Sequence, residues 1–261
     1  MSFSIPLDMV VRFVLVLARF GGLVTFVPFW SNAAVNARTR IIIALMLSLV
    51  AYPVVADSIP ASAIDPTSSS MVMNVFGELM IGFAIGLVVR FVFAGLEMAG
   101  QLVGFQIGLS VVNAIDPQSQ VRVPTFSAFF TFFASVIFLM IDAHHWCLIA
   151  VFHSYDRAPV GGFHLSGQLL DFLITLAGQI FATGLQLSAA VVAVLVVIDI
   201  ALGIIARAAP QIQLLVISFP IKIMAGLITL GLSLYFFPAA VESYLQKMQS
   251  NLFKLITLLH G

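Results

Sequence analysis

The chain has 261 residues, of which 61% are hydrophobic and only 8% are charged, with 11 basic residues balancing 11 acidic ones. An ordinary soluble domain is about 45–50% apolar and about 25% charged. So few charges cannot keep this much apolar surface soluble, which excludes a cytosolic enzyme and a disordered tail, and the lack of a basic excess excludes a nucleic-acid binder. The composition predicts an α-helical integral membrane protein.

The first part of the chain contains four apolar segments that approach the length of about 20 residues needed to span a bilayer. They cover about residues 9–30, 41–56, 71–110 and 126–152. The third segment would be about 60 Å long as a straight helix, which is too long for one crossing. We therefore expect it to bend, to break or to protrude from the membrane.

The second part, residues 168–238, is nearly all apolar and has one strong break at residues 208–211. This pattern predicts a long helix, a tight turn and a returning helix, which brings the number of expected spans to six. The tail from Glu242 has the pattern of an amphipathic helix. Because the apolar runs are continuous rather than alternating, they do not favour a β-barrel.

Seven ionisable residues lie inside these apolar segments. They are Arg12, Arg19, Glu78, Arg90, Glu97, Asp199 and Lys222. Each costs about 2.5–3.5 kcal/mol at the centre of a spanning helix, so they should face protein or water rather than lipid. Two interpretations stay open: a polar conduit or proton path, and structural pairing inside a helical bundle.

One pair of these residues can be placed by geometry. If the chain reverses near Pro210, Asp199 lies 11 residues before the turn and Lys222 lies 12 residues after it. At 1.5 Å per residue both lie about 17 Å from the turn and face each other across the hairpin. We expect an ion pair there that sets the register of the hairpin rather than moving protons.

Glycines recur at helical spacing in the third segment. Gly82 and Gly86 are separated by four residues, and so are Gly100, Gly104 and Gly108. Each set lines one helix face and permits close approach of another backbone. The partner helix belongs either to this chain or to another subunit.

The polar segment between the third and fourth apolar runs, about residues 106–124, is flanked by apolar sequence on both sides. One interpretation is a re-entrant or pore-lining loop, which would have to lie beside protein or water because non-helical backbone is not tolerated against lipid. The other is an ordinary external loop.

The sequence contains no motif for catalysis or cofactor binding. His144, His145 and Cys147 lie close together, but adjacent histidines lack the i, i+4 spacing of a helical zinc site. No G-x-S-x-G, P-loop or H-E-x-x-H motif occurs. We therefore expect no catalytic residue, no metal and no cofactor.

Three stretches of the chain resemble the FliR family of flagellar export-gate components and its injectisome counterparts. They are G-E-L-M-I-G at residues 77–82, A-G-Q-L-V-G-F-Q-I-G at 99–108 followed by Asp116-Pro117, and G-I-I-A-R-A-A-P-Q-I at 203–212 followed by S-F-P-I-K-I at 218–223. The R-A-A-P-Q run at residues 207–211 is the most specific of them. The length and the order of the apolar segments also fit, so the resemblance covers nearly the whole chain.

The resemblance implies a non-enzymatic subunit built from long, bent helical hairpins. A FliP-like half, residues 1–167, would precede a FliQ-like hairpin and tail, residues 168–261. FliP and FliQ subunits would be its partners in a gate for unfolded export substrates, and an FlhB-type switch protein would join them. The hairpin tip, with Arg207, Pro210 and Gln211, would point towards the cytoplasmic entrance.

The resemblance also implies that residues 106–122 form a plug that closes the pore. The residues assigned to this plug are Gln106, Ile107, Gly108, Leu109, Asn113, Asp116, Pro117, Gln118, Ser119, Gln120 and Arg122. The assembled gate would belong to the flagellar basal body in the bacterial inner membrane, in contact with lipid and largely towards the periplasmic side. An injectisome gate subunit is the alternative, and a small secondary transporter is a more distant one because no internal repeat is visible.

Overall fold

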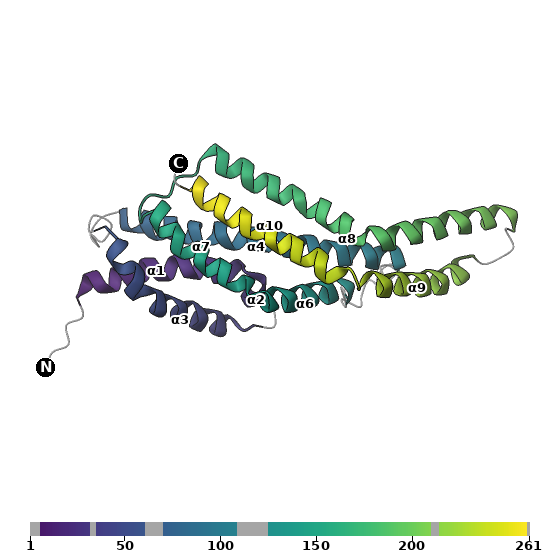
Figure 1. Ribbon diagram of the computed structural model, residues 1–261, viewed down its shortest axis with the longest axis horizontal. Coiled ribbons are helices and arrows are strands. Elements are labelled where there is room, and N and C mark those ends of the chain that lie inside the picture. The colour runs from purple at the N-terminus through teal and green to yellow at the C-terminus, as the bar shows by residue number, and fades with distance from the viewer. Residues whose placement is uncertain (1–5, 32–34, 61–69, 109–124, 210–213, 260–261) are drawn as a thin grey trace. The chain divides into compact units, whose positions relative to one another are not determined.

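The computed structural model of the protein describes residues 6–31, 35–60, 70–108, 125–209 and 214–259. All regular structure in these ranges is helical (Figure 1). In chain order the elements are α1 Leu7–Phe26, α2 Pro28–Ser31, α3 Ala37–Val55, the 3-10 helix η1 Ala56–Ser58, α4 Ser70–Ile107, α6 Thr125–Met140, α7 Ala143–Arg157, α8 Gly167–Ala208, α9 Leu214–Ser233 and α10 Phe237–Leu258. The prediction of an all-α polytopic membrane fold is confirmed.

Among the described residues, four helices, α1, α3, α4 and α8, are long and apolar enough to cross a membrane. The number rises to six if each of the bent pairs α6–α7 and α9–α10 is counted as one span. Helix α4 has 38 residues and α8 has 42, which correspond to about 57 and 63 Å. Both exceed the hydrocarbon thickness of about 30 Å. The third apolar segment was expected to bend, to break or to protrude from the membrane. It does not break within the described residues, because α4 is continuous from Ser70 to Ile107.

Two of the expected helix boundaries were wrong. The apolar run at residues 126–152 is divided into α6 and α7, because the chain leaves the helix at Asp142, whose φ is 56°. The second helix of the hairpin ends at Ser233 rather than near Pro238, and Pro238 instead lies in the first turn of α10. Proline is tolerated there because the first turn of a helix has no intrahelical partner for its N–H groups. Apolar composition alone revealed neither break.

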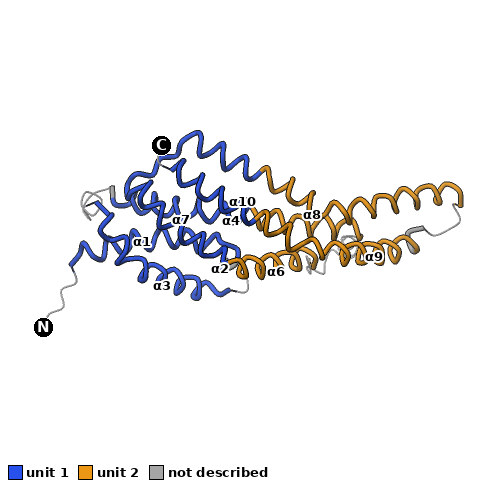
Figure 2. The backbone as a smooth tube through the Cα atoms, viewed as in Figure 1, with its two compact units in different colours: residues 1–91, 142–177, 245–261 blue, residues 92–141, 178–244 orange. Residues whose placement is uncertain are grey.

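The chain divides into two compact units (Figure 2). Unit 1 contains residues 1–91, 142–177 and 245–261, and unit 2 contains residues 92–141 and 178–244. Helices α4, α8 and α10 each contribute to both units. Each unit therefore contains residues from both expected halves of the chain. The two units are defined by contacts in space, whereas the expected boundary near residue 167 rests on the resemblance of each half to FliP or FliQ. The units therefore do not test that boundary, which stays a prediction.

The core of unit 1 forms where α1 approaches α4. A Cβ at Gly22 would lie 2.5 Å from the carbonyl oxygen of Leu79, and a Cβ at Gly82 would overlap the carbonyl oxygen of Arg19. These two glycines let the backbones of α1 and α4 come into direct contact. Helix α3 packs on α1, with the rings of Phe13 and Tyr52 edge to face.

The core of unit 2 is rich in phenylalanine. Phe93 of α4 packs on Phe138 of α6, and Phe130 of α6 packs on Phe237 of α10, both edge to face. A Cβ at Gly100 would lie 2.5 Å from the backbone of Ser127, so α4 and α6 also approach closely. The Ser127 hydroxyl donates to the carbonyl oxygen of Glu97 at this crossing.

Much of the apolar surface is left uncovered. Only 11% of the most apolar stretch of α8 is buried, and 22% of that of α3, compared with about half of those of α1 and α4. Exposed side chains on α8 include Val197, Ile200 and Ile204. These two helices present the surface that lipid or other subunits would cover.

Candidate functional site

A cluster of polar side chains in unit 2 lies where α8, α9 and the end of α4 meet. Lys222 of α9 has its Nζ 2.8 Å from Oδ1 and 3.0 Å from Oδ2 of Asp199 on α8. Gln106 of α4 donates from Nε2 to the same Oδ2 at 3.0 Å. The structure thus places Asp199 and Lys222 in the contact expected from their distances to the turn, and adds a third member.

Apolar residues of the same three helices pack together beside these side chains. Ile107, the last residue of α4, is buried, and a Cβ at Gly226 of α9 would lie 2.6 Å from it and 3.5 Å from Leu195 of α8. Gly108 follows with φ +95° and donates its N–H to the carbonyl oxygen of Phe105. The left-handed conformation of Gly108 ends α4. Glycine suits this position because a residue with a side chain would be strained at that φ.

The other residues assigned to the plug, Leu109 to Arg122, lie outside the described residues. At the hairpin tip the same holds for Pro210 and Gln211, whereas Arg207 is exposed near the end of α8. The plug and tip assignments therefore stay predictions.

The glycines assigned to helix packing contact different partners. Gly82 and Gly86 of α4 face α1, and Gly100 faces the start of α6. Gly104 has only an ordinary contact, 3.5 Å to the ring of Phe126. All of these contacts are within the chain, and packing against other subunits at these glycines stays a prediction.

A buried ion pair in unit 1 was missed by the sequence analysis. Arg19 of α1 donates from Nε to Oε2 of Glu78 on α4 at 2.5 Å, and from Nη2 to Oε1 at 2.9 Å. Both side chains are almost fully buried. The remaining guanidinium donors reach the Ser154 hydroxyl at 2.8 Å and the Ala158 carbonyl oxygen at 2.9 Å, and the ring of Tyr155 stacks on the group.

A signal for this pair was present in the sequence. Arg19 precedes Gly22 by three residues and Glu78 precedes Gly82 by four, so each charge lies about one helical turn before a glycine that permits close approach. Two glycines that bring the backbones together also bring these two side chains together. The G-E-L-M-I-G run therefore combines a charge and a contact glycine on one face of α4.

Arg12 is also bound within unit 1. Its guanidinium donates to the carbonyl oxygen of Ala56 and, at 3.0 Å, to that of Ile59. Ala56 is the first residue of the short helix η1, which follows α3, and Ile59 is the residue after η1. Of the seven ionisable residues in apolar runs, Arg12, Arg19, Glu78, Asp199 and Lys222 are thus engaged by protein groups.

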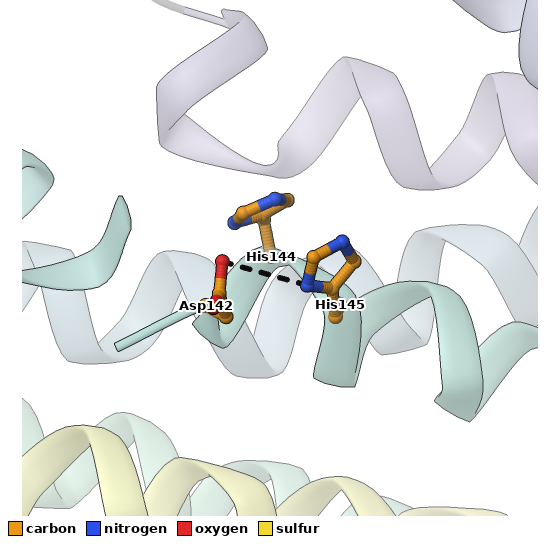
Figure 3. Close-up of side chains that lie close together, drawn as sticks. All are labelled: Asp142, His144 and His145. Atoms are coloured by element: carbon orange, nitrogen blue, oxygen red, sulfur yellow. Dashed lines mark ion pairs between the residues drawn. The ribbon is translucent and has the colours of Figure 1, made fainter. Parts of the chain in front are cut away.

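Asp142, His144 and His145 form a cluster at the start of α7 (Figure 3). Their possible ligand atoms lie within 4.8 Å of one another, and His145 Nδ1 is 3.6 Å from Asp142 Oδ1. The sequence had suggested these three residues only as the groups that an intramembrane enzyme would use, an alternative that the absence of a paired motif made remote. Imidazole and carboxylate groups suit zinc, but Asp142 and His145 are exposed and all three come from one turn of chain. The expectation that the chain binds no metal stays a prediction.

Comparison with known proteins adds the family. The family described as "Bacterial export proteins, family 1" matches residues 10–248. The chain belongs to this family. The family is one of export proteins rather than of enzymes, and the resemblance to the FliR family seen in the sequence is confirmed.

Curated relatives in this family carry the name flagellar biosynthetic protein FliR. The protein from Bacillus subtilis (strain 168) is 30% identical over 86% of this chain and 86% of its own length. The protein from Pectobacterium carotovorum subsp. carotovorum is 28% identical over 92% of this chain and 91% of its own. The protein from Escherichia coli (strain K12) is 28% identical over 81% and 79%. The similarity therefore extends over both predicted halves.

Proposed function

We propose that the protein is a core subunit of the flagellar type III protein export gate in the bacterial inner membrane. The observation that carries this proposal is the family match over residues 10–248. FliP-type and FliQ-type subunits would complete a channel for unfolded substrates, and an FlhB-type switch protein would dock beside the tip that carries Arg207. The gate would lie largely towards the periplasm. The proposed role is structural and needs no catalytic residue.

The distribution of polar and apolar side chains supports this proposal. The exposed surface of α8 is largely apolar, whereas Arg19 and Glu78 pair within unit 1 and Asp199 and Lys222 pair within unit 2. An apolar surface with its charges neutralised can be covered either by lipid or by other subunits. A transporter would instead need a substrate site of polar groups free to bind a ligand near the midplane.

The flagellar assignment is preferred to an injectisome assignment because the matched relatives named above are flagellar biosynthetic proteins. The test is to produce the chain with FliP-type and FliQ-type subunits from the same organism and to purify it through a tag on this chain. We expect one stable complex that contains all three. A chain that purifies alone and transports a small solute would contradict the proposal.

We also propose that residues 106–122 form the plug of the gate. The end of α4 at Ile107 supports this, because the segment begins at the contact between α4, α8 and α9. Deleting residues 106–122 should raise ion leakage through an assembled gate, measured by the membrane potential of cells that produce it. An assembled gate that stays tight after the deletion would contradict the plug assignment.

A further inference from the structure

The carboxylate of Asp199 accepts hydrogen bonds from two other helices. Lys222 occupies both of its oxygens, at 2.8 and 3.0 Å, and Gln106 Nε2 approaches Oδ2 at 3.0 Å. A carboxylate offers about four acceptor positions, so it can hold both donors at once. Lys222 is 18% exposed and Asp199 43%, so one side of the pair is covered by protein and the other is open.

A glutamine suits the third position because its amide is neutral. A carboxylate at position 106 would be repelled by Asp199, and an ammonium group would compete with Lys222 for the same oxygens. The amide N–H adds a bond to a charged acceptor without changing the net charge of the pair, and such bonds are stronger than those between neutral groups.

The same faces of α8 and α9 also hold the apolar part of the last turn of α4. On α9, Phe219, Lys222 and Gly226 are spaced three and four residues apart and so share one face, as Leu195 and Asp199 do on α8. Gly226 contacts Ile107, and Phe219 lies against Gly108, where an added Cβ would be 3.1 Å from its ring. Three successive residues of the chain, from position 106 to 108, are therefore each held by the hairpin.

We propose that the Asp199–Lys222 pair is a latch for the end of α4, and that Gln106 is the positioning residue through which the pair holds residues 106–108. The ion pair does more than join α8 to α9, since its carboxylate also binds the last turn of α4 through Gln106. The proposal rests on the proposed function, in which residues 106–108 form the base of the plug.

The test compares Gln106→Leu with Gln101→Leu, an exposed glutamine of the same helix, in the gate assembled with its partner subunits. Leucine keeps the bulk of glutamine and removes the amide donor. In Gln106→Leu we expect amide hydrogen exchange over residues 103–107 to be about tenfold faster, because a bond to a charged group contributes at least such a factor to a local equilibrium. We also expect ion leakage between that of the original gate and that of the 106–122 deletion.

Each outcome decides between the interpretations. If the deletion leaks but Gln106→Leu matches Gln101→Leu in leakage and exchange, the latch is wrong and the plug assignment stands. If the deletion does not leak, the plug assignment fails and the positioning role fails with it. Should Gln106→Leu not assemble, Gln106→Asn, which keeps the amide but is one methylene too short, replaces it. Failure of both variants to assemble would mean a purely structural role and would overturn the proposal.

Discussion

Arg19 and Glu78 are the charged side chains that the described part of the chain buries most deeply. Burying two charges is costly, and the pair is tolerated because every contact around it satisfies a donor or an acceptor. The guanidinium binds the carboxylate at two points, a hydroxyl and a backbone carbonyl, and one face of it lies on an aromatic ring. Removing one partner leaves the other charge alone in an apolar core.

We therefore predict that Glu78→Ala destabilises the protein by about 3–5 kcal/mol, because it leaves an unpaired buried guanidinium. The melting temperature of the detergent-purified protein, or of the purified complex, measures this loss. Asp156→Ala, which removes an exposed carboxylate of α7, is the matched control and should change little. The double variant Arg19→Met with Glu78→Met should recover much of the loss, and a double variant less stable than Glu78→Ala would contradict this explanation.

A second prediction concerns Asp199 and the register of the hairpin. Asp199→Asn removes the charge that Lys222 faces at 2.8 Å but keeps the size of the side chain. We expect it to lower the amount of assembled gate, measured by co-purification of the partner subunits. Asp171→Asn, an exposed carboxylate at the start of the same helix, is the control. Normal assembly with loss of export would show instead that the charge acts in transport.

At the scale of elements, glycines determine which helices come into direct contact. Gly22 and Gly82 bring α1 and α4 together in unit 1, and Gly100 does the same for α4 and α6 in unit 2. A long apolar helix without such positions would approach its neighbours only to the distance that its side chains allow. The single helix α4 thus uses different glycines to join different partners.

Gly21 and Gly22 provide a matched pair of positions to test this role. A Cβ at Gly22 would lie 2.5 and 2.8 Å from backbone atoms of α4, whereas a Cβ at Gly21 meets nothing within 4 Å. Gly22→Ala should cost about 1–3 kcal/mol because the backbones must separate. Gly21→Ala should be neutral or stabilising by up to about 1 kcal/mol, because alanine favours the helix. Equal thermal stability of the two variants would contradict the contact.

At the scale of the whole molecule, the chain leaves a large apolar surface open. The most apolar stretch of α8 is 11% buried, and the exposed side chains of α3 include Ile41, Leu49 and Val50. Lipid covers such surfaces in most membrane proteins, but a subunit of a multi-chain gate uses part of them for assembly. Which helix faces which environment can be measured directly.

We predict that α8 is covered by protein in the assembled gate. A photoreactive phenylalanine derivative at Val197 or Ile204 should cross-link to a partner subunit on illumination, because both side chains are exposed in the isolated chain. The same group at His164, an exposed residue of the polar connection before α8, is the control and should give few such products. Adducts to lipid alone at both α8 positions would show that this helix faces the bilayer.

Much of the fold and part of the site were predictable. Apolar runs of about 20 residues or more predicted the long helices, and the break at residues 208–211 predicted the reversal between α8 and α9. Equal distances from that reversal predicted the contact of Asp199 with Lys222. Gln106 was assigned to the plug, but its bond to Asp199 was not foreseen, since it joins residues 93 positions apart in the chain.

By itself, the sequence determined the class of the protein, its helices and its family, because these depend on composition, on local apolar runs and on motifs that are continuous in the chain. Only the tertiary structure decided that Arg19 meets Glu78. Arg19 and Glu78 are 59 residues apart, and nothing local specifies their contact until Gly22 and Gly82 bring α1 and α4 together. The breaks at Asp142 and after Ser233 likewise depend on backbone conformation. The apolar content of the surrounding residues does not reveal that conformation.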